Sequence, residues 1–201
     1  MINFDFFTPT KILFGAGREN EVGKQIVAFG GHKVMIVYGK KGGHIETSGL
    51  LDKVHKSLSD AGLSYVDLNG VVPNPRLSLV KEGIRIGRAE GVDFLLPIGG
   101  GSVIDTAKGI GYGIANDFEM EDLLYGRVKT DKNLPIGVIL TIAAAGSEMS
   151  SSMVLTIEDG MMKRSYGHDC SRPRFAIMNP ELTYSLPAYQ TASGAADIMM
   201  H

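Results

Sequence analysis

The stretch from residue 94 to residue 108 constrains the fold more than any other part of the sequence. The apolar run Phe94–Ile98 leads into three glycines, Gly99–Gly101, and Ser102 then opens a helical pattern. A strand, a glycine turn and a helix in this order present backbone N–H groups at the positive end of the helix, with no Cβ atoms in the way. Because such a turn binds phosphate, the stretch predicts a pyrophosphate site for a dinucleotide.

The turn matches neither of the two common phosphate-binding motifs. It is not the G-x-G-x-x-G of the usual Rossmann fingerprint, and no Gly-Lys-Ser/Thr follows that would make it a P-loop. A plain tight turn is therefore the alternative interpretation. Ser102 and Asp105 also have the spacing of an S-x-x-D capping box. We expect Asp105 either to cap the helix or to lie at the ligand.

Apolar runs alternate with helical patterns along most of the chain, which predicts an α/β fold with a mainly parallel sheet. A hairpin is expected around Asp159-Gly160, and a last helix over 188–201. The carboxyl ends of parallel strands meet at one edge, so the turns at Gly39, at Gly99–Gly101 and at Thr141 should converge on one crevice. The expected strands of the sheet are 33–38, 64–68, 94–98, 134–141 and 174–178.

Composition excludes several classes of function. The net charge of −2 gives no electrostatic support for binding nucleic acid or an anionic membrane. The single cysteine, Cys170, excludes an internal disulfide framework and suits a reducing compartment. The first residues lack the pattern of a signal peptide, and no apolar run approaches the ~20 residues of a membrane span. We expect a cytoplasmic protein.

A second candidate site lies in the last helical pattern. Asp197 and His201 are four residues apart and so share one face of a helix. A carboxylate and an imidazole placed in this way can share one divalent ion of the Fe or Zn type. The alternative is a local Asp–His hydrogen bond, or two polar side chains that face water.

The residues after the strand at 33–38 bear on the choice of cofactor. An acidic residue at this place usually bonds the ribose 2′-OH and disfavours a 2′-phosphate. Here Gly39 is followed by Lys40 and Lys41, so no carboxylate comes directly after the strand and two cations can attract phosphate. The sequence favours NADP(H) over NAD(H), with an ordinary solvated loop as the alternative.

These motifs together resemble the iron-containing (group III) alcohol dehydrogenase family. The resemblance rests on the runs Gly99–Lys108, Gly146–Glu148 and Gly194–His201, and on the Phe7–Gly15 and Val72–Pro75 stretches, and it extends along essentially the whole chain. The branch it resembles most is that of the NADPH-dependent butanol dehydrogenases and aldehyde reductases. The resemblance implies a metal-dependent enzyme that transfers a hydride between NADP(H) and a small alcohol or aldehyde.

The resemblance also implies a division of the chain and roles for its residues. Residues 1–186 would form the dinucleotide-binding domain, and 187–201 the start of an all-helical metal-binding domain. Asp197 and His201 would be the first ligands of Fe²⁺ or Zn²⁺, with further histidines from later helices. The implied cofactor contacts are Gly39, Gly99, Gly100, Gly101, Ser102, Asp105, Thr141, Ser147 and Lys163.

The sequence stops at His201, roughly half of a family member, so the helical domain would be almost wholly absent. We therefore expect the chain to bind metal weakly or not at all and to lack turnover. Apolar surface that the second domain should cover predicts self-association, as in a homo-oligomer, or poor solubility. Two alternatives stay open. One is a nucleotide-binding module without turnover, and the other is a glycerol-dehydrogenase-like or dehydroquinate-synthase-like enzyme on the same fold.

Overall fold

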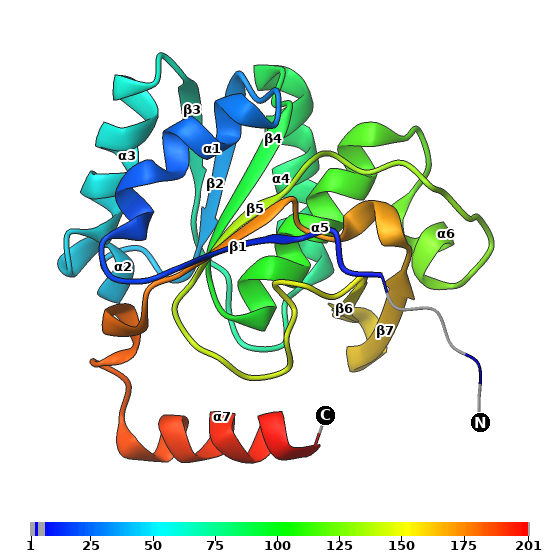
Figure 1. The fold of residues 1–201 in the computed structure, drawn as a ribbon. Helices are drawn as coiled ribbons and strands as arrows, with labels where there is room; N and C mark the ends of the chain where they lie inside the picture. Colours follow the sequence, from blue (N-terminus) through cyan, green and yellow to red (C-terminus); the bar gives the residue numbers. More distant parts are fainter. Residues whose placement is uncertain (1–2, 4–6, 201) are drawn as a thin grey trace.

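The structure, a computed structural model, describes residue 3 and residues 7–200. Its main sheet has six strands in the order β1-β8-β5-β4-β2-β3, and every neighbouring pair is parallel (Figure 1). This arrangement confirms the predicted α/β fold with a mainly parallel sheet. The strands are β1 (Lys11–Phe14), β2 (Lys33–Tyr38), β3 (Ser64–Leu68), β4 (Phe94–Gly99), β5 (Gly137–Leu140) and β8 (Phe175–Met178).

Helices cover both faces of this sheet because its central strands are apolar on both sides. In β2, Val34 and Ile36 belong to one buried cluster, whereas Met35 and Val37 belong to the other. This alternation follows from the period of two along a strand. Helices α1 (Val22–Ala28) and α3 (Leu50–Asp60) cover the first face, and α4 (Leu77–Glu90) and α5 (Gly101–Ala115) cover the second.

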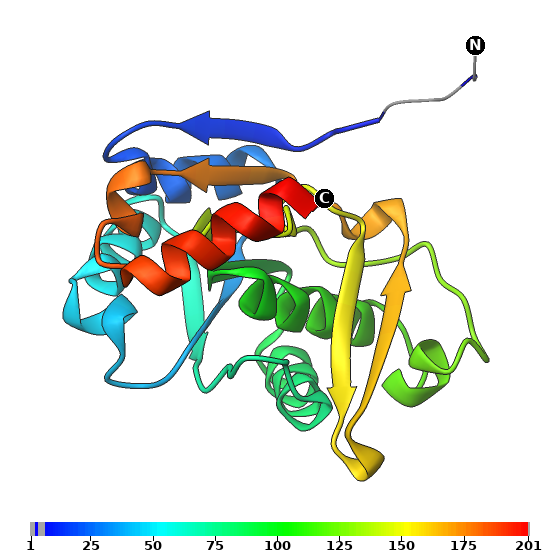
Figure 2. The same ribbon diagram turned by 90° about the horizontal axis from the view of Figure 1, so that it is seen from below.

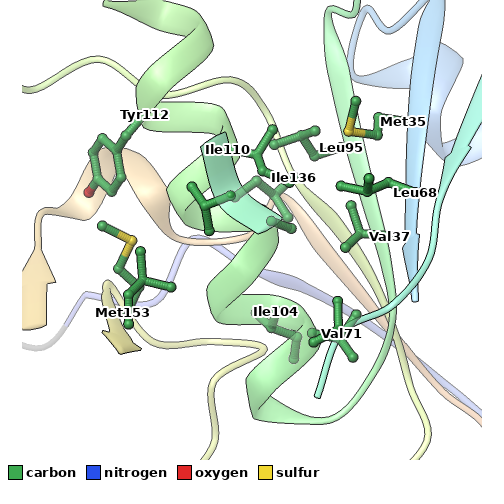
Figure 3. Close-up of a cluster of buried hydrophobic side chains, with 14 of the residues drawn as sticks. Met35, Val37, Leu68, Val71, Leu95, Ile104, Ile110, Tyr112, Ile136 and Met153 are labelled. Carbon is green, nitrogen blue, oxygen red and sulfur yellow. The ribbon is translucent and has the colours of Figure 1, made fainter. Parts of the chain in front are cut away.

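Glycines bring α4 and α5 close together on the second face. A Cβ atom on Gly83 of α4 would lie 2.5 Å from Ile110 Cδ1, and one on Gly113 of α5 would lie 2.1 Å from Ile84 Cδ1. Each isoleucine thus occupies the space above a glycine of the other helix. Figure 3 shows Ile104 and Ile110 of α5 within the apolar cluster on this face. The packing fixes α5, which begins at the glycine turn.

A hairpin forms a separate two-stranded antiparallel sheet from β6 (Ser152–Ile157) and β7 (Met162–Gly167), which confirms the hairpin expected around Asp159-Gly160. Leu155 of β6 is fully buried. A Cβ on Gly109 of α5 would lie 3.1 Å from Leu155 Cδ1. The hairpin therefore packs on α5.

Short helices complete the fold: α2 (His44–Thr47), α6 (Met120–Leu124), η1 (Arg18–Glu21), η2 (Asp159–Met161), η3 (Asp169–Ser171) and η4 (Pro180–Thr183). The last helix is α7 (Ala188–Met200), and it crosses the side of the molecule where the parallel strands end (Figures 1 and 2). Gly194 makes this approach close, because a Cβ there would lie 2.6 Å from the Ala143 carbonyl oxygen. No helix within residues 7–200 is long and apolar enough to cross a bilayer.

Candidate nucleotide-binding site

The order of the strands creates a crevice at the carboxyl ends of β2 and β4. From β2 the chain proceeds outward to β3, and it then returns to place β4 on the other side of β2. The two turns that follow β2 and β4 therefore diverge at this point. In open parallel sheets, ligands bind at such a topological switch point. Gly39 follows one strand and Gly99 ends the other, so both of these predicted residues stand at the crevice.

The turn after β4 is packed so tightly that it excludes side chains. A Cβ on Gly99 would lie 2.6 Å from Val103 Cγ2, and a Cβ on Gly100 would lie 2.4 Å from Ile142 Cγ2. Gly100 is the N-cap of α5, and no side chain caps this helix end in the described chain. The first N–H groups of the helix are therefore left to an external acceptor. The geometry is that of an anion cradle.

The capping box predicted for Ser102 and Asp105 is wrong. Ser102 is the second residue of α5 rather than its cap. The Asp105 carboxylate turns away from the helix end and accepts a 3.0 Å hydrogen bond from the Val154 backbone N–H. Burial raises the pKa of Asp105 to about 6, against the opposing effects of this hydrogen bond and of the Lys108 charge. Asp105 thus fastens the hairpin to α5, and its direct contact with a cofactor stays a prediction.

A second loop, residues 141–151, stands beside the glycine turn. The Thr141 backbone N–H donates a 3.2 Å hydrogen bond to the Gly99 carbonyl, which ties the start of this loop to the turn. Further along, Ser147 Oγ lies 3.2 Å from the place that a Cβ on Gly101 would occupy. The structure thus brings Thr141 to the glycine turn, as the convergence of strand ends predicts, and it brings Ser147 there as well.

Lys108, which the sequence interpretation did not single out, anchors this loop from inside. Its side chain is fully buried, and its ammonium donates to the carbonyl oxygens of Ser147, Ser150 and Ser152 at 3.0, 2.8 and 2.8 Å. Burial lowers the pKa of Lys108 to about 8, although the charges of Asp105 and Glu148 oppose that change. The available sequence signal was a lysine in the middle of a largely apolar helix, three residues after Asp105.

The turn after β2 holds a carboxylate that the residues directly after the strand did not reveal. Glu46 of α2 folds back and accepts from the Gly42 N–H at 2.7 Å and from the Tyr38 hydroxyl at 3.0 Å. Burial raises the pKa of Tyr38 to about 12, and the hydrogen bond to Glu46 adds to the rise. Tyr38 therefore stays a donor at neutral pH, and Glu46 holds the turn closed. Lys40 and Lys41 are exposed.

A cavity of about 210 Å³ opens between the turn after β2 and the segment after β8. His44 Nε2 and Ser185 Oγ are hydrogen bonded across it at 2.9 Å. Its walls combine polar and apolar groups, as small-molecule sites do. Thr141 lines it, so the cavity continues the site beyond the glycine turn. Other residues that line it are Ile45, Lys53, Leu182 and Tyr184.

The remaining predicted residues lie on two other elements. Lys163 is exposed on β7, opposite Thr156 in the hairpin. Asp197 lies half-buried on α7, while His201 is outside the described residues. Within the described part of the chain, no three His, Cys, Asp or Glu side chains stand close enough to hold a metal ion. The described residues alone do not fit a metal centre, and the pairing of Asp197 with His201 stays a prediction.

A parallel sheet with a glycine turn at its switch point is the arrangement of a Rossmann-like α/β domain. Residues 9–180 match the sequence model of iron-containing alcohol dehydrogenases. This chain belongs to the iron-containing alcohol dehydrogenase family.

Individual relatives agree with this assignment. The chain is 42% identical over its whole length to NADH-dependent butanol dehydrogenase A of Clostridium acetobutylicum, of which it covers 51%. It is 35% identical to the NADPH-dependent aldehyde reductase YqhD of Escherichia coli, again over the whole chain and 51% of the relative. The crystal structure of NADH-dependent butanol dehydrogenase A from Thermotoga maritima superimposes with a TM-score of 0.95 at 38% identity, over 99% of this chain and 50% of that one. The chain thus spans about half the length of these relatives.

Proposed function

We propose that this chain is the nucleotide-binding part of a dehydrogenase that transfers a hydride between NADP(H) and a small alcohol or aldehyde. One observation carries the proposal: Cβ atoms on Gly99 and Gly100 would clash with their neighbours at the switch point, and the N-terminal end of α5 has no side-chain cap. Family membership supports the reaction class, since relatives are named butanol dehydrogenase and aldehyde reductase.

Each part of the site has a role in binding. The N–H groups of Gly101 and Ser102 would hold the pyrophosphate at the positive end of α5. The loop that carries Thr141 and Ser147 would form the second wall, and the cavity beside Thr141 would take the adenosine part. The nicotinamide, when bound, accepts or supplies the hydride, and the protein orients it. Within this proposal Lys163 remains a further contact.

The turn after β2 supports the preference for NADP(H). Gly39 has no side chain, and a Cβ there would meet nothing nearer than the Val71 carbonyl oxygen at 3.8 Å. Lys40 and Lys41 place two exposed cations beside it. The nearby Glu46 carboxylate already accepts from the Gly42 N–H and the Tyr38 hydroxyl. A 2′-phosphate would therefore meet open space and positive charge.

We assign no step of the reaction to a metal in this chain. Asp197 and His201 are proposed as the first ligands of Fe²⁺ or Zn²⁺, which a longer protein would complete. We further propose that these 201 residues alone bind the nucleotide without turnover, because a catalytic zinc ion usually needs three protein ligands.

Isothermal titration of the chain with NADP⁺ and NAD⁺ tests nucleotide binding. We expect NADP⁺ to bind more tightly. In Gly101→Asp, a new carboxylate at the helix end should repel the pyrophosphate and weaken binding about 100-fold, or about 2.7 kcal/mol. Ser64→Asp is the matched control, because Ser64 begins β3 and so places the same charge at the amino ends of the strands. Tighter binding of NAD⁺ would refute the NADP(H) preference, and unchanged binding by Gly101→Asp would refute the site.

An activity assay tests the second part of the proposal. Oxidation of NADPH is followed with butyraldehyde, with and without added Fe²⁺ or Zn²⁺. We expect no turnover by the chain alone. Turnover under either condition would show that these residues suffice for the reaction.

A further inference from the structure

Lys108 places a positive charge in the interior of the molecule. The side chain lies in the middle of α5 with no exposed surface, and its ammonium reaches residues 147–152. Burying an ammonium ion is costly unless its hydrogen bonds are satisfied there. The surroundings of Lys108 therefore show what the charge does.

All the acceptors of Lys108 come from one short segment. The ammonium has three N–H donors, and they reach the carbonyl oxygens of Ser147, Ser150 and Ser152. None of these is a carboxylate, so the lysine does not serve an ion pair. It binds the backbone of residues 147–152, the end of the irregular loop and the first residue of β6, where carbonyl groups need partners from another part of the chain.

The segment 147–152, which ends the loop and begins β6, starts at the glycine turn. Ser147 contributes both a carbonyl to Lys108 and the hydroxyl that faces Gly101. Asp105, one helical turn before Lys108, holds the Val154 N–H just beyond the segment. Arg172 donates to the Met149 carbonyl from the other side, at 2.8 Å. The distance between loop and turn is thus set by α5, the same helix that begins at the turn.

We propose that Lys108 is a positioning residue of the nucleotide site: its buried ammonium holds residues 147–152 against α5, so that the second wall of the site meets the glycine turn. The proposal rests on the proposed function for its consequence, nucleotide binding. An apolar side chain would fill the space but would take the ammonium donors from all three carbonyl groups, and the Ser152 carbonyl would keep only the Ser150 hydroxyl at 3.4 Å.

The positive charge of Lys108, which holds residues 147–152, depends on pH. Asp105 on α5, Glu148 on the loop and Arg172 after η3 are the charged groups whose fields act on Lys108. Burial, the largest cause, lowers its pKa to about 8. Above that pH the neutral amine has only two N–H donors for three carbonyls, so the hold on the loop should weaken.

The test uses Lys108→Met, which keeps an unbranched side chain and removes the charge. Lys56→Met is the control, because Lys56 is exposed on α3 and pairs with Asp60 at 2.7 Å. Hydrogen exchange should show protection factors for residues 147–152 lowered about tenfold in Lys108→Met, with α1 and α3 unchanged. The Kd for NADP⁺ should rise about tenfold, and Lys56→Met should match the wild type in both measurements.

A pH series separates positioning from a merely structural role. In the wild type, NADP⁺ affinity and the protection of residues 147–152 should fall from about pH 7 to about pH 9.5, and in Lys108→Met both should be flat over this range. If Lys108→Met does not fold, the pH series on the wild type alone tests the proposal. Wild-type values that do not change with pH would overturn the proposal, as would normal protection in Lys108→Met. A wild type that binds no nucleotide would refute the proposed function. The hydrogen-exchange protection of residues 147–152 would then still show whether Lys108 holds this segment.

Discussion

The two glycine turns at the switch point use glycine for different physical reasons. After β4, the glycines are needed because neighbours occupy the space: Cβ atoms on Gly99 and Gly100 would come within 2.6 and 2.4 Å of other side chains. After β2, the space is open. A Cβ on Gly39 would have its nearest neighbour at 3.8 Å, and Gly42 has nothing within 4 Å but adopts a φ of +70°.

The difference separates a turn held by packing from a turn held by hydrogen bonds. The turn after β4 lies between Val103 and Ile142, so its shape is a property of the core. The turn after β2 is closed by Glu46 and Tyr38 and carries exposed lysines. The packed turn suits the pyrophosphate, which NAD and NADP share. The open turn has room for different side chains, which can set which of the two cofactors binds.

The largest effect is expected from adding a methyl group to the packed turn. Gly100→Ala should destabilise the chain by about 3 kcal/mol, because overpacking forces Ile142 and the loop to shift. It should also weaken NADP⁺ binding. Gly39→Ala adds the same methyl group to the open turn and should change stability by less than about 0.5 kcal/mol. Urea denaturation of both variants measures this, and equal losses would show that the two turns do not differ in packing.

The carboxylates beside the two turns sharpen the comparison. Burial raises the pKa of Asp105 from 3.8 to about 6, so the folded chain holds a proton there that the unfolded chain has released. Between about pH 4 and pH 6, the contribution of this group to the free energy of unfolding therefore falls by about 2 kcal/mol as the pH rises. Asp105→Asn should remove that loss and so gain stability relative to the wild type between about pH 4 and pH 6.

Thermal or urea unfolding across this pH range measures the gain of Asp105→Asn over the wild type. The control is Glu46→Gln, which removes a half-buried carboxylate from the open turn. A difference between Asp105→Asn and the wild type that stays constant with pH would contradict the burial of this charge.

The smallest effect is expected from a charge placed in the open turn. Gly39→Asp should weaken NADP⁺ binding relative to NAD⁺ by about tenfold, or about 1.4 kcal/mol, because a carboxylate repels the 2′-phosphate and bonds a ribose 2′-OH. Stability should change little. Parallel titrations of both nucleotides with Gly39→Asp and Gly39→Ala give the ratio, and an unchanged ratio would place the 2′-phosphate elsewhere.

Local pattern was enough to predict the elements that make the site. Apolar runs such as Phe94–Ile98 form strands because burial on both faces needs no more than a continuous apolar stretch. The hairpin around Asp159-Gly160 was equally predictable from turn chemistry. The S-x-x-D pattern failed because Gly100, two residues before Ser102, is already the N-cap of α5. The Asp105 carboxylate instead accepts a hydrogen bond from the distant Val154 N–H.

The sequence by itself therefore determined which segments are strands, helices and glycine turns, because these depend on neighbours a few residues apart. Only the tertiary structure decided that β4 returns to the side of β2 opposite β3, since strand order depends on how whole helices pack across the sheet. It also decided what Lys108 does. The acceptors of that ammonium lie 39 to 44 residues further along the chain, and no local pattern brings three carbonyl groups to one buried charge.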